Sequence, residues 1–222
     1  MRSGGCLPGR ARQCDGVPAY AFPVALHKYA GTRPTCALVP YQHAFELSAA
    51  DFVGDGLFHA CSSIPIDPPG AIEAIRNLDA NGLLVVVVSN QAGIARGLYS
   101  ERDVILLHEK VNAELYRHGT KIDAFYYPHH PEFGEKLVCD CRKPAPGLLL
   151  KAQRDWDIDS ARSFLIGDKA DDMRAGEAIG VTPMLVSTGY GTKQRERAGP
   201  GITFVEDLLA ASRIILRHAR TR

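Results

Sequence analysis

The stretch LIGDKADDM, residues 165–173, decides the fold because it joins an apolar segment to a helix-like segment through an acidic turn. The apolar run leads directly into Gly167 and Asp168. This pattern predicts a buried strand that carries the Asp168 carboxylate at its carboxyl end. In an open α/β sheet, ligands bind at that end of the strands. We therefore expect a ligand site at Asp168, with more charged residues close behind it: Lys169, Asp171 and Asp172.

Strand-like and helix-like segments alternate from about Asp67 onward. The run LLVVVV (83–88) is short, continuous and rich in β-branched residues, as in a buried parallel strand. Ile72, Ile75 and Leu78 fall on one face of a predicted helix. We predict helices at 68–82, 100–119, 146–156, 170–180 and 206–218, strands at 83–88, 122–127, 163–168, 183–187 and 202–205, and a polar glycine-rich loop at 187–201.

This alternation predicts a doubly wound parallel sheet, that is, a three-layer, Rossmann-like α/β fold. We assign residues 67–222 to this domain. Residues 1–66 are an atypical segment, with scattered Gly, Pro, Cys and His and little sustained periodicity. That segment either supplies a first central strand or is disordered.

The composition sets limits on the function. The chain has 222 residues, of which 45% are hydrophobic and 23% charged, and its net charge is +1. The balanced charge offers no one-signed field to nucleic acid or to a membrane surface. No apolar run approaches the roughly 18 residues of a membrane span, and the N-terminal run AYAFPVAL is broken by Pro23, which argues against a signal peptide. We expect a cytoplasmic monomer with no nucleic-acid or membrane partner.

Polar groups suited to a phosphate follow three of the predicted strands. A hydroxyl with backbone amides, a lysine and a carboxylate that meet at one sheet edge can surround one phosphate and one Mg²⁺. Taken singly, a serine after a strand is usually a cap and a lysine is usually solvated, so the combination carries the prediction. In chain order the groups are Ser89, Asn90 and Gln91, then Arg142 and Lys143, then Asp168 and Lys169.

Three segments resemble motifs of the haloacid dehalogenase superfamily of phosphohydrolases: VVVVSNQAGIARG (85–97), CDCRKPAPG (139–147) and FLIGDKADDM (164–173). Within that superfamily they resemble the phosphatases that remove the 7-phosphate of D-glycero-D-manno-heptose 1,7-bisphosphate. The resemblance covers about residues 67–186. The histidinol-phosphate phosphatases share the CxCRKP loop, but the GIARG segment favours the heptose group.

The resemblance implies a haloacid dehalogenase-like sheet and catalytic roles for three residues. Ser89 would bind the transferring phosphoryl group, and Lys143 would neutralise charge on its oxygens. Asp168 would coordinate Mg²⁺, the implied cofactor. Asp172 would support this metal site from the start of its helix, where negative charge is favourable.

The resemblance also implies how the substrate, a small phosphorylated sugar, is bound. Asn90 and Gln91 would frame it together with Ser89 and Lys143. Arg142 would recognise its second phosphate, which suits a two-pronged donor. Lys169 would make a further contact.

A structural Zn²⁺ is the second metal that the resemblance implies. Phosphatases of this type hold it with Cys-x-His and Cys-x-Cys, and this chain offers His129, Cys139 and Cys141. Tyr127 stands where the first cysteine is expected. A four-coordinate site is thus one ligand short, unless His130 replaces the missing cysteine. Two ordinary cysteines in a reduced loop are the other interpretation.

The superfamily's nucleophile motif, Asp-x-Asp-Gly, is missing before residue 67. The first aspartate of that motif would form an aspartyl-phosphate, and the second would act as acid and base. The nearest matches are QCDGV (13–17) and VGDGL (53–57), in which Gln13 and Val53 stand at the nucleophile position. Neither side chain can form a phosphoenzyme.

Three interpretations remain open. The reading frame could be altered before about residue 67, the protein could be a degenerate homologue that binds phosphosugars without turnover, or another carboxylate such as Asp51 or Asp55 could be recruited. The last ranks lowest, because in-line attack needs a well-placed group. We expect little or no phosphatase activity from this chain, although its lineage is that of a sugar bisphosphate phosphatase.

Overall fold

The computed structural model describes residues 19–21, 35–39, 70–95, 97–128 and 140–220. Their strands are β1 (Ala19–Ala21), β2 (Cys36–Val39), β3 (Leu84–Val88), β4 (Ala124–Tyr126), β5 (Phe164–Gly167), β6 (Thr182–Val186) and β7 (Thr203–Val205). Their helices are α3 (Ala71–Ala80), α4 (Ala92–Ala95), α5 (Glu101–Arg117), α6 (Gly147–Trp156), α7 (Ala170–Glu177), α8 (Gly191–Ala198) and α9 (Leu208–Arg220), with a 3-10 turn at Ser160–Arg162.

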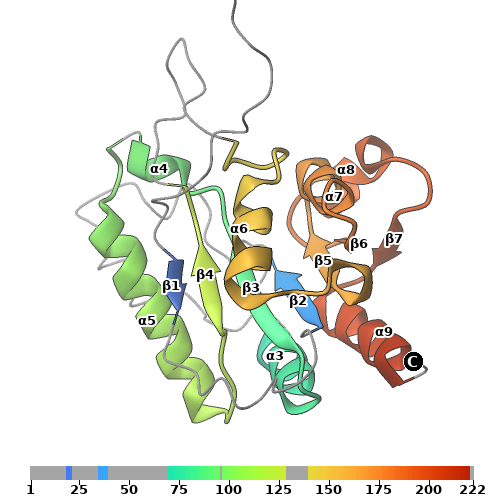
Figure 1. The fold of residues 1–222 in the computed structure, drawn as a ribbon, viewed down its shortest axis with the longest axis horizontal. Coiled ribbons are helices and arrows are strands. Elements are labelled where there is room, and N and C mark those ends of the chain that lie inside the picture. Colours follow the sequence, from blue (N-terminus) through green and yellow to red (C-terminus); the bar gives the residue numbers. More distant parts are fainter. Residues whose placement is uncertain (1–18, 22–34, 40–69, 96, 129–139, 221–222) are drawn as a thin grey trace, which may run out of the picture.

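The strands form one sheet in the order β1-β4-β3-β2-β5-β6-β7 (Figure 1). All neighbouring strands are parallel except β1, which joins the edge antiparallel to β4. β2 lies in the middle, with Leu38 opposite both Val86 of β3 and Leu165 of β5. The predicted parallel α/β sheet is confirmed, and its central strand comes from the atypical segment 1–66. The domain boundary near residue 67 stays a prediction.

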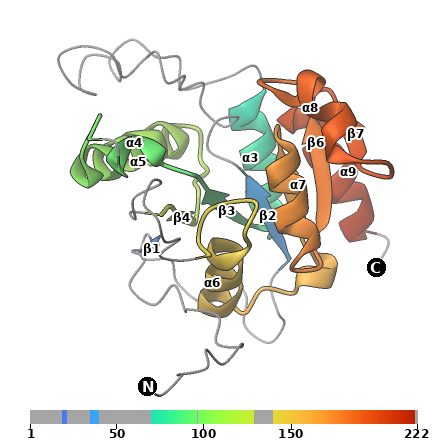
Figure 2. The same ribbon diagram turned by 90° about the horizontal axis from the view of Figure 1, so that it is seen from above.

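Helices cover both faces of the sheet because side chains alternate along each strand. Val85 and Val87 of β3 pack in one core cluster with α3, α5 and α9. Leu84, Val86 and Val88 pack in a second cluster with α6 and α7. Figure 2 shows α3 and α6 on opposite sides of the sheet. The whole of β3 is therefore buried, as expected of a parallel strand between two helical layers.

The helices and strands predicted between residues 68 and 186 are confirmed, with small shifts at their ends. Ser100 is the N-cap of α5 as predicted: its hydroxyl accepts the Asp103 N–H at 3.3 Å, and the Asp103 carboxylate accepts the Ser100 N–H at 2.8 Å. β7 and α9 also lie where strand 202–205 and helix 206–218 are expected.

The predicted loop at 187–201 is wrong, because α8 occupies Gly191–Ala198. The helix has the sequence GTKQRERA, and Gly191 is its only fully buried residue. It therefore lacks the apolar stripe by which a sequence reveals a helix. The short helix α4, which the sequence analysis does not predict, contains Gly93, where a Cβ would lie 2.0 Å from the Tyr99 ring.

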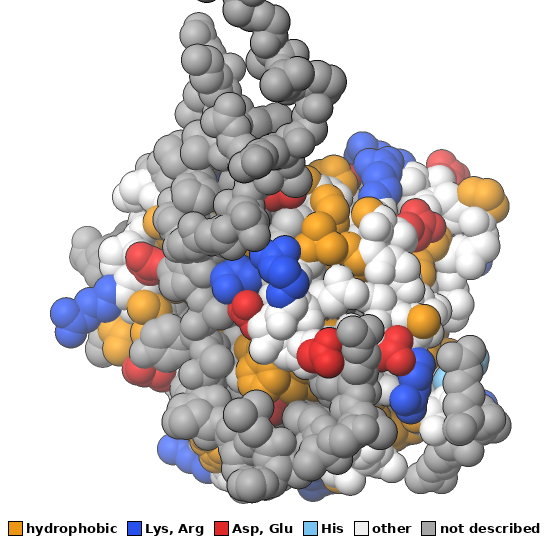
Figure 3. All heavy atoms as spheres, in the orientation of Figure 1, with side chains coloured by type: hydrophobic (Ala, Val, Ile, Leu, Met, Phe, Trp, Pro, Cys, Tyr) orange, Lys and Arg blue, Asp and Glu red, His pale blue; other side chains and the backbone are white. Residues whose placement is uncertain are grey.

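The described surface mixes charges. On the face in Figure 3, Lys and Arg side chains lie among Asp, Glu and apolar groups. No described helix combines the length and apolar character that a bilayer crossing requires. The absence of nucleic-acid and membrane partners, the monomeric state and the cytoplasmic location stay predictions.

His108 of α5 is a histidine inside the apolar core. It is 1% exposed, and its ring stacks on Phe125 with the centroids 4.0 Å apart. Burial lowers the pKa of His108 from 6.5 to about 3. The folded protein therefore keeps this ring neutral at pH values where the unfolded chain protonates it.

We expect the free energy of unfolding to decrease as the pH falls below about 6.5. In this range the unfolded chain binds a proton at His108, whereas the folded chain does not bind it until about pH 3. The full effect is about 1.4 kcal/mol per pH unit. His108→Phe keeps a stacked ring without the titration, so its free energy of unfolding should fall less between neutral pH and about pH 5. Urea unfolding of both proteins measures the free energy of unfolding at each pH. If it falls equally with pH in the parent and in His108→Phe, His108 is not the source of the pH dependence.

Candidate functional site

The residues predicted for phosphate binding lie where strands end at the carboxyl edge of the sheet. Ser89 follows β3 and is 7% exposed, and its N–H donates to the Tyr126 oxygen of β4 at 2.9 Å. Gln91 is equally buried, and its Oε1 accepts a hydrogen bond from the Tyr99 hydroxyl at 2.7 Å. Hydrogen bonds thus fix the chain that leaves β3.

A turn from Asp140 to Gly147 brings the second group to this edge. The Gly147 N–H donates to the Asp140 oxygen at 2.9 Å and closes the turn. A Cβ at Gly147 would lie 2.6 Å from that oxygen, so the close approach requires glycine. The turn carries Arg142, which is half-buried, and Lys143, which is 8% exposed.

The Lys143 ammonium joins two elements that are distant in the sequence. Its Nζ donates to the Val88 oxygen at the end of β3 at 2.8 Å. It also lies 2.7 Å from Oδ1 of Asp172 in α7, and both side chains are at most 6% exposed. An ammonium has three donors, so one remains after these two contacts among the described residues.

Asp172 is held in place by the first turn of α7. Its Oδ2 accepts the Lys169 N–H at 3.2 Å, and its Oδ1 takes the Lys143 ammonium. Gly167, at the end of β5, makes room for this carboxylate, since a Cβ there would lie 2.6 Å from the Asp172 Cβ. Both carboxylate oxygens therefore have protein partners, and the predicted role of Asp172 at a metal stays a prediction.

Asn90 bonds to the same lysine at its main chain. The Asn90 Nδ2 donates to the Lys143 oxygen at 3.0 Å, and the Lys143 N–H donates to Asn90 Oδ1 at 3.1 Å. The Asn90 side-chain amide thus bonds to both the N–H and the C=O of Lys143, in the way that the backbone of a neighbouring strand does. This clamp ties the turn to the end of β3.

Asp168 follows β5 and is 1% exposed. Its Oδ2 accepts the Tyr190 N–H at 3.1 Å. Tyr190 is 53% exposed, and the centroid of its ring lies 4.9 Å from the Lys169 ammonium, which is a cation–π contact. Tyr190 could not be predicted as a site residue, because the polar stretch around it was expected to be a loop. The only signal for it was the glycine at position 191, which permits a close approach.

That close approach is made by the first turn of α8. A Cβ at Gly191 would lie 1.5 Å from the Val186 oxygen at the end of β6 and 3.9 Å from the Asp168 Cα. No side chain fits there. Gly191 thus sets the position from which Tyr190 reaches Asp168.

The arrangement suits an anion and a hard cation. The Lys143 ammonium and the amides after β3 can receive phosphate oxygens, and the Asp168 carboxylate is a ligand type that Mg²⁺ prefers. No group of three or more His, Cys, Asp and Glu side chains within the described ranges is placed to hold a metal ion on its own. Mg²⁺ commonly uses one or two carboxylates together with substrate phosphate and water, so Asp168 fits that mode.

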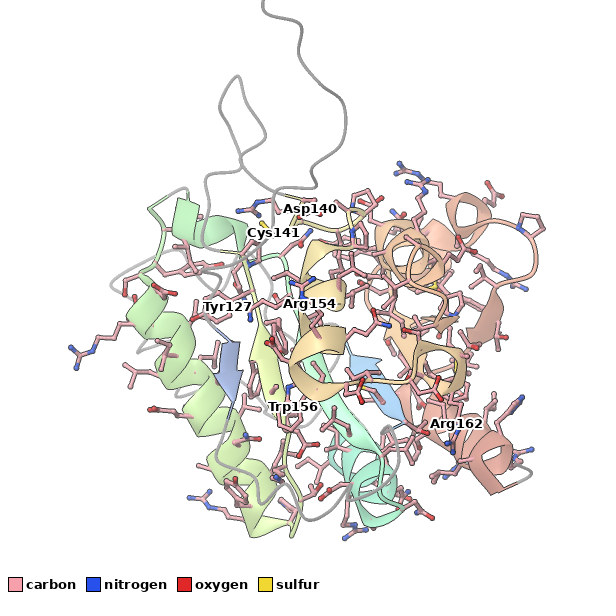
Figure 4. The ribbon with its side chains drawn as sticks, viewed as in Figure 1. Tyr127, Asp140, Cys141, Arg154, Trp156 and Arg162 are labelled. Carbon is pink, nitrogen blue, oxygen red and sulfur yellow. The ribbon has the colours of Figure 1, made fainter. Side chains whose placement is uncertain are left out.

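The predicted zinc loop is described only at its two ends. Cys141 is fully buried and forms a disulfide, and since the other described cysteine, Cys36, is free, its partner lies outside the described residues. Tyr127 is also fully buried, and its hydroxyl donates to Glu101 of α5 at 3.3 Å. Figure 4 shows Tyr127 and Cys141. His129, His130 and Cys139 lie outside the described residues.

Gly191→Ala should destabilise the protein by about 2 kcal/mol, because the new methyl group forces α8 away from β6. Urea unfolding gives this value. Lys193→Ala is the control, since it also leaves an alanine in α8 but at an exposed position, and it should stay within about 0.5 kcal/mol of the parent. Equal stabilities for the two variants would show that α8 does not pack as described.

Comparisons with known proteins identify the family of the chain. Residues 140–211 match a family model described as HAD-hydrolase-like. A D-glycero-beta-D-manno-heptose-1,7-bisphosphate 7-phosphatase of Photorhabdus laumondii is 43% identical over 146 residues, which are 63% of this chain and 78% of that protein. The phosphatase of the same name from Vibrio cholerae is 47% identical over 54% of this chain and 67% of its own length.

A solved structure shares the fold over almost its full length. The D,D-heptose 1,7-bisphosphate phosphatase of B. bronchiseptica, crystallised with magnesium and phosphate, has a TM-score of 0.71 and 30% identity over 83% of this chain and 98% of its own. Both the sequence relatives and this structure point to one family. The chain belongs to the haloacid dehalogenase-like phosphatases, which are phosphoric monoester hydrolases.

Proposed function

We propose that this chain binds D-glycero-D-manno-heptose 1,7-bisphosphate with its 7-phosphate at Ser89, Lys143 and Asp168, and that hydrolysis of that phosphate is the reaction of its lineage. The observation that carries the proposal is the buried Lys143 ammonium, which is held between the end of β3 and α7. One of its three N–H donors is not used by the described residues. Such a donor forms a strong charge-assisted bond to a phosphate oxygen. The names of the relatives support this sugar as the substrate.

Mg²⁺ is the cofactor that fits the proposal. Asp168 would hold it, and the phosphate and water would complete the coordination. When bound, the ion supplies positive charge to the phosphoryl oxygens. The relative crystallised with magnesium and phosphate supports this choice. Asp172, whose oxygens contact Lys143 and the Lys169 N–H, would hold the lysine in place beside the ion.

The remaining site residues would bind the sugar end of the substrate. Arg142 is in the same turn as Lys143 and is half-buried, which suits recognition of the second phosphate by a guanidinium group. Lys169 lies under the exposed Tyr190 ring, where it can meet a ligand that enters the site. Gln91 would help to frame the sugar from the end of β3.

The chemical step is where this chain departs from its lineage. An aspartyl-phosphate route needs a carboxylate at the end of the central strand. The central strand β2 ends at Val39, and the sequence continues PYQHAFE, so its next carboxylate is Glu46. We propose that binding is retained while turnover is low or absent. A phosphosugar-binding homologue without catalysis is thus the alternative function, and an altered reading frame before about residue 67 would explain its origin.

The first experiment measures phosphate release from the heptose bisphosphate with Mg²⁺, beside an Asp168→Asn control. We expect no more release from the parent than from the control, because the sequence offers no carboxylate between the end of β2 and Glu46. The same sugar should nevertheless raise the melting temperature of the parent in Mg²⁺, and the control should respond less. Histidinol phosphate, the substrate of the alternative relatives, should have a weaker effect.

Two results would change the proposal. Release that Asp168→Asn abolishes would mean that a nucleophile exists in the part of the chain outside the described residues. No thermal shift with either ligand, from a protein that melts cooperatively, would refute the binding function itself.

We also propose a weakened Zn²⁺ site at His129, Cys139 and Cys141. Cys141 can serve as a ligand only after its disulfide is reduced, because zinc binds the thiolate. The Tyr127 hydroxyl donates to Glu101, and the tyrosine supplies no thiolate where the first cysteine of the motif is expected.

Tyr127→Cys should bind Zn²⁺ more tightly than the parent under reducing conditions, because it supplies the missing fourth thiolate. Competition with a coloured chelator measures the two affinities. Tyr127→Ser, which shortens the side chain equally but offers no thiolate, is the control. If the Ser and Cys variants bind zinc alike, this loop holds no four-coordinate site.

A further inference from the structure

Asn90 is predicted to contact the substrate, and in the structure its side chain makes two hydrogen bonds to Lys143. The Nδ2 donates to the Lys143 oxygen at 3.0 Å, and the Oδ1 accepts the Lys143 N–H at 3.1 Å. A pair of bonds from one planar amide to one residue fixes both the distance and the rotation of that residue's main chain. Asn90 therefore fixes the position of the Lys143 main chain, from which its side chain extends.

The far end of the same side chain is fixed as well. The ammonium lies 2.8 Å from the Val88 oxygen and 2.7 Å from Asp172 Oδ1. Val88 and Asn90 are separated by one residue, Ser89. The segment that carries the proposed phosphate-binding serine thus holds Lys143 at both its main chain and its ammonium.

A lysine needs such fixation to bind a small anion well. Its free side chain has about 2 kcal/mol of rotamer entropy to lose. The turn from Asp140 to Gly147 has its own hydrogen bonds, from Gly147 to Asp140 and from Ala145 to Arg142, but these do not involve the Lys143 peptide groups. Within the described residues, the side chain of Asn90 supplies the hydrogen bonds of the Lys143 main chain.

We propose that Asn90 is a positioning residue, which acts on the phosphate through Lys143 rather than by touching the ligand. The proposal rests on the phosphate-binding function proposed above. It predicts that Asn90 matters for phosphate binding only while Lys143 carries its ammonium.

A double-mutant cycle tests this with inorganic phosphate and Mg²⁺ in a calorimeter. Asn90→Ala should weaken phosphate binding about tenfold, the equivalent of about 1.4 kcal/mol for two lost hydrogen bonds. The second background is the double variant Lys143→Gln, Asp172→Asn, which replaces the ion pair by a neutral amide pair and so leaves no buried charge unpaired. In that background, Asn90→Ala should change the affinity less than twofold. A tenfold loss in both backgrounds would mean that Asn90 contacts the phosphate directly, and the proposal would be wrong.

Amide hydrogen exchange at Lys143 gives a readout that does not depend on phosphate. Asn90→Ala should accelerate exchange of this amide, because its acceptor is removed. Asn90→Asp keeps that acceptor and should restore most of the protection. Unchanged exchange in Asn90→Ala would overturn the positioning role even if phosphate binds. A parent that binds no phosphate would overturn the proposed function, while exchange would still report whether Asn90 holds Lys143.

Discussion

The buried ion pair between Lys143 and Asp172 is the constraint on which the edge of this sheet depends. Two charges that are at most 6% exposed are tolerated only when they are paired and hydrogen-bonded. The pair joins the turn before α6 to the start of α7, and the Val88 oxygen adds the end of β3. Gly167 is required because the Asp172 carboxylate packs against it. Three segments far apart in the sequence are thus positioned by one electrostatic contact.

Much of this arrangement could be predicted from the sequence, for a geometric reason. β3 is a continuous apolar run and α5 has a polar cap and an apolar stripe, so each element shows its own periodicity. Once the strands are parallel, the residues that follow them must lie at one edge. What could not be predicted is which polar groups bond to one another. The contacts of Asn90 and Asp172 with Lys143 depend on side-chain distances that no spacing in the sequence encodes.

Two of the elements that could not be predicted from the sequence, α8 and β2, owe their structure to contacts with the rest of the fold. α8 is polar along most of its length, and it is held by the contact of Gly191 with the end of β6. β2 is only four residues long, and the prediction of a central strand from the segment 1–66 stayed open. Its place is fixed because it supplies hydrogen-bond partners to the backbone groups of β3 on one side and of β5 on the other.

The central position of β2 has a consequence for the order in which the protein forms. β2 pairs on one side with β3 and on the other with β5, and the Cys36 N–H bonds to Ser163 across 127 residues. Contacts between such remote segments slow folding, because a long loop must close before they form. During synthesis on the ribosome, the edge of β2 that pairs with β5 therefore stays unpaired until most of the chain has emerged. The middle of the sheet is completed only when β5 becomes available, and until then the unpaired edge of β2 is exposed to aggregation.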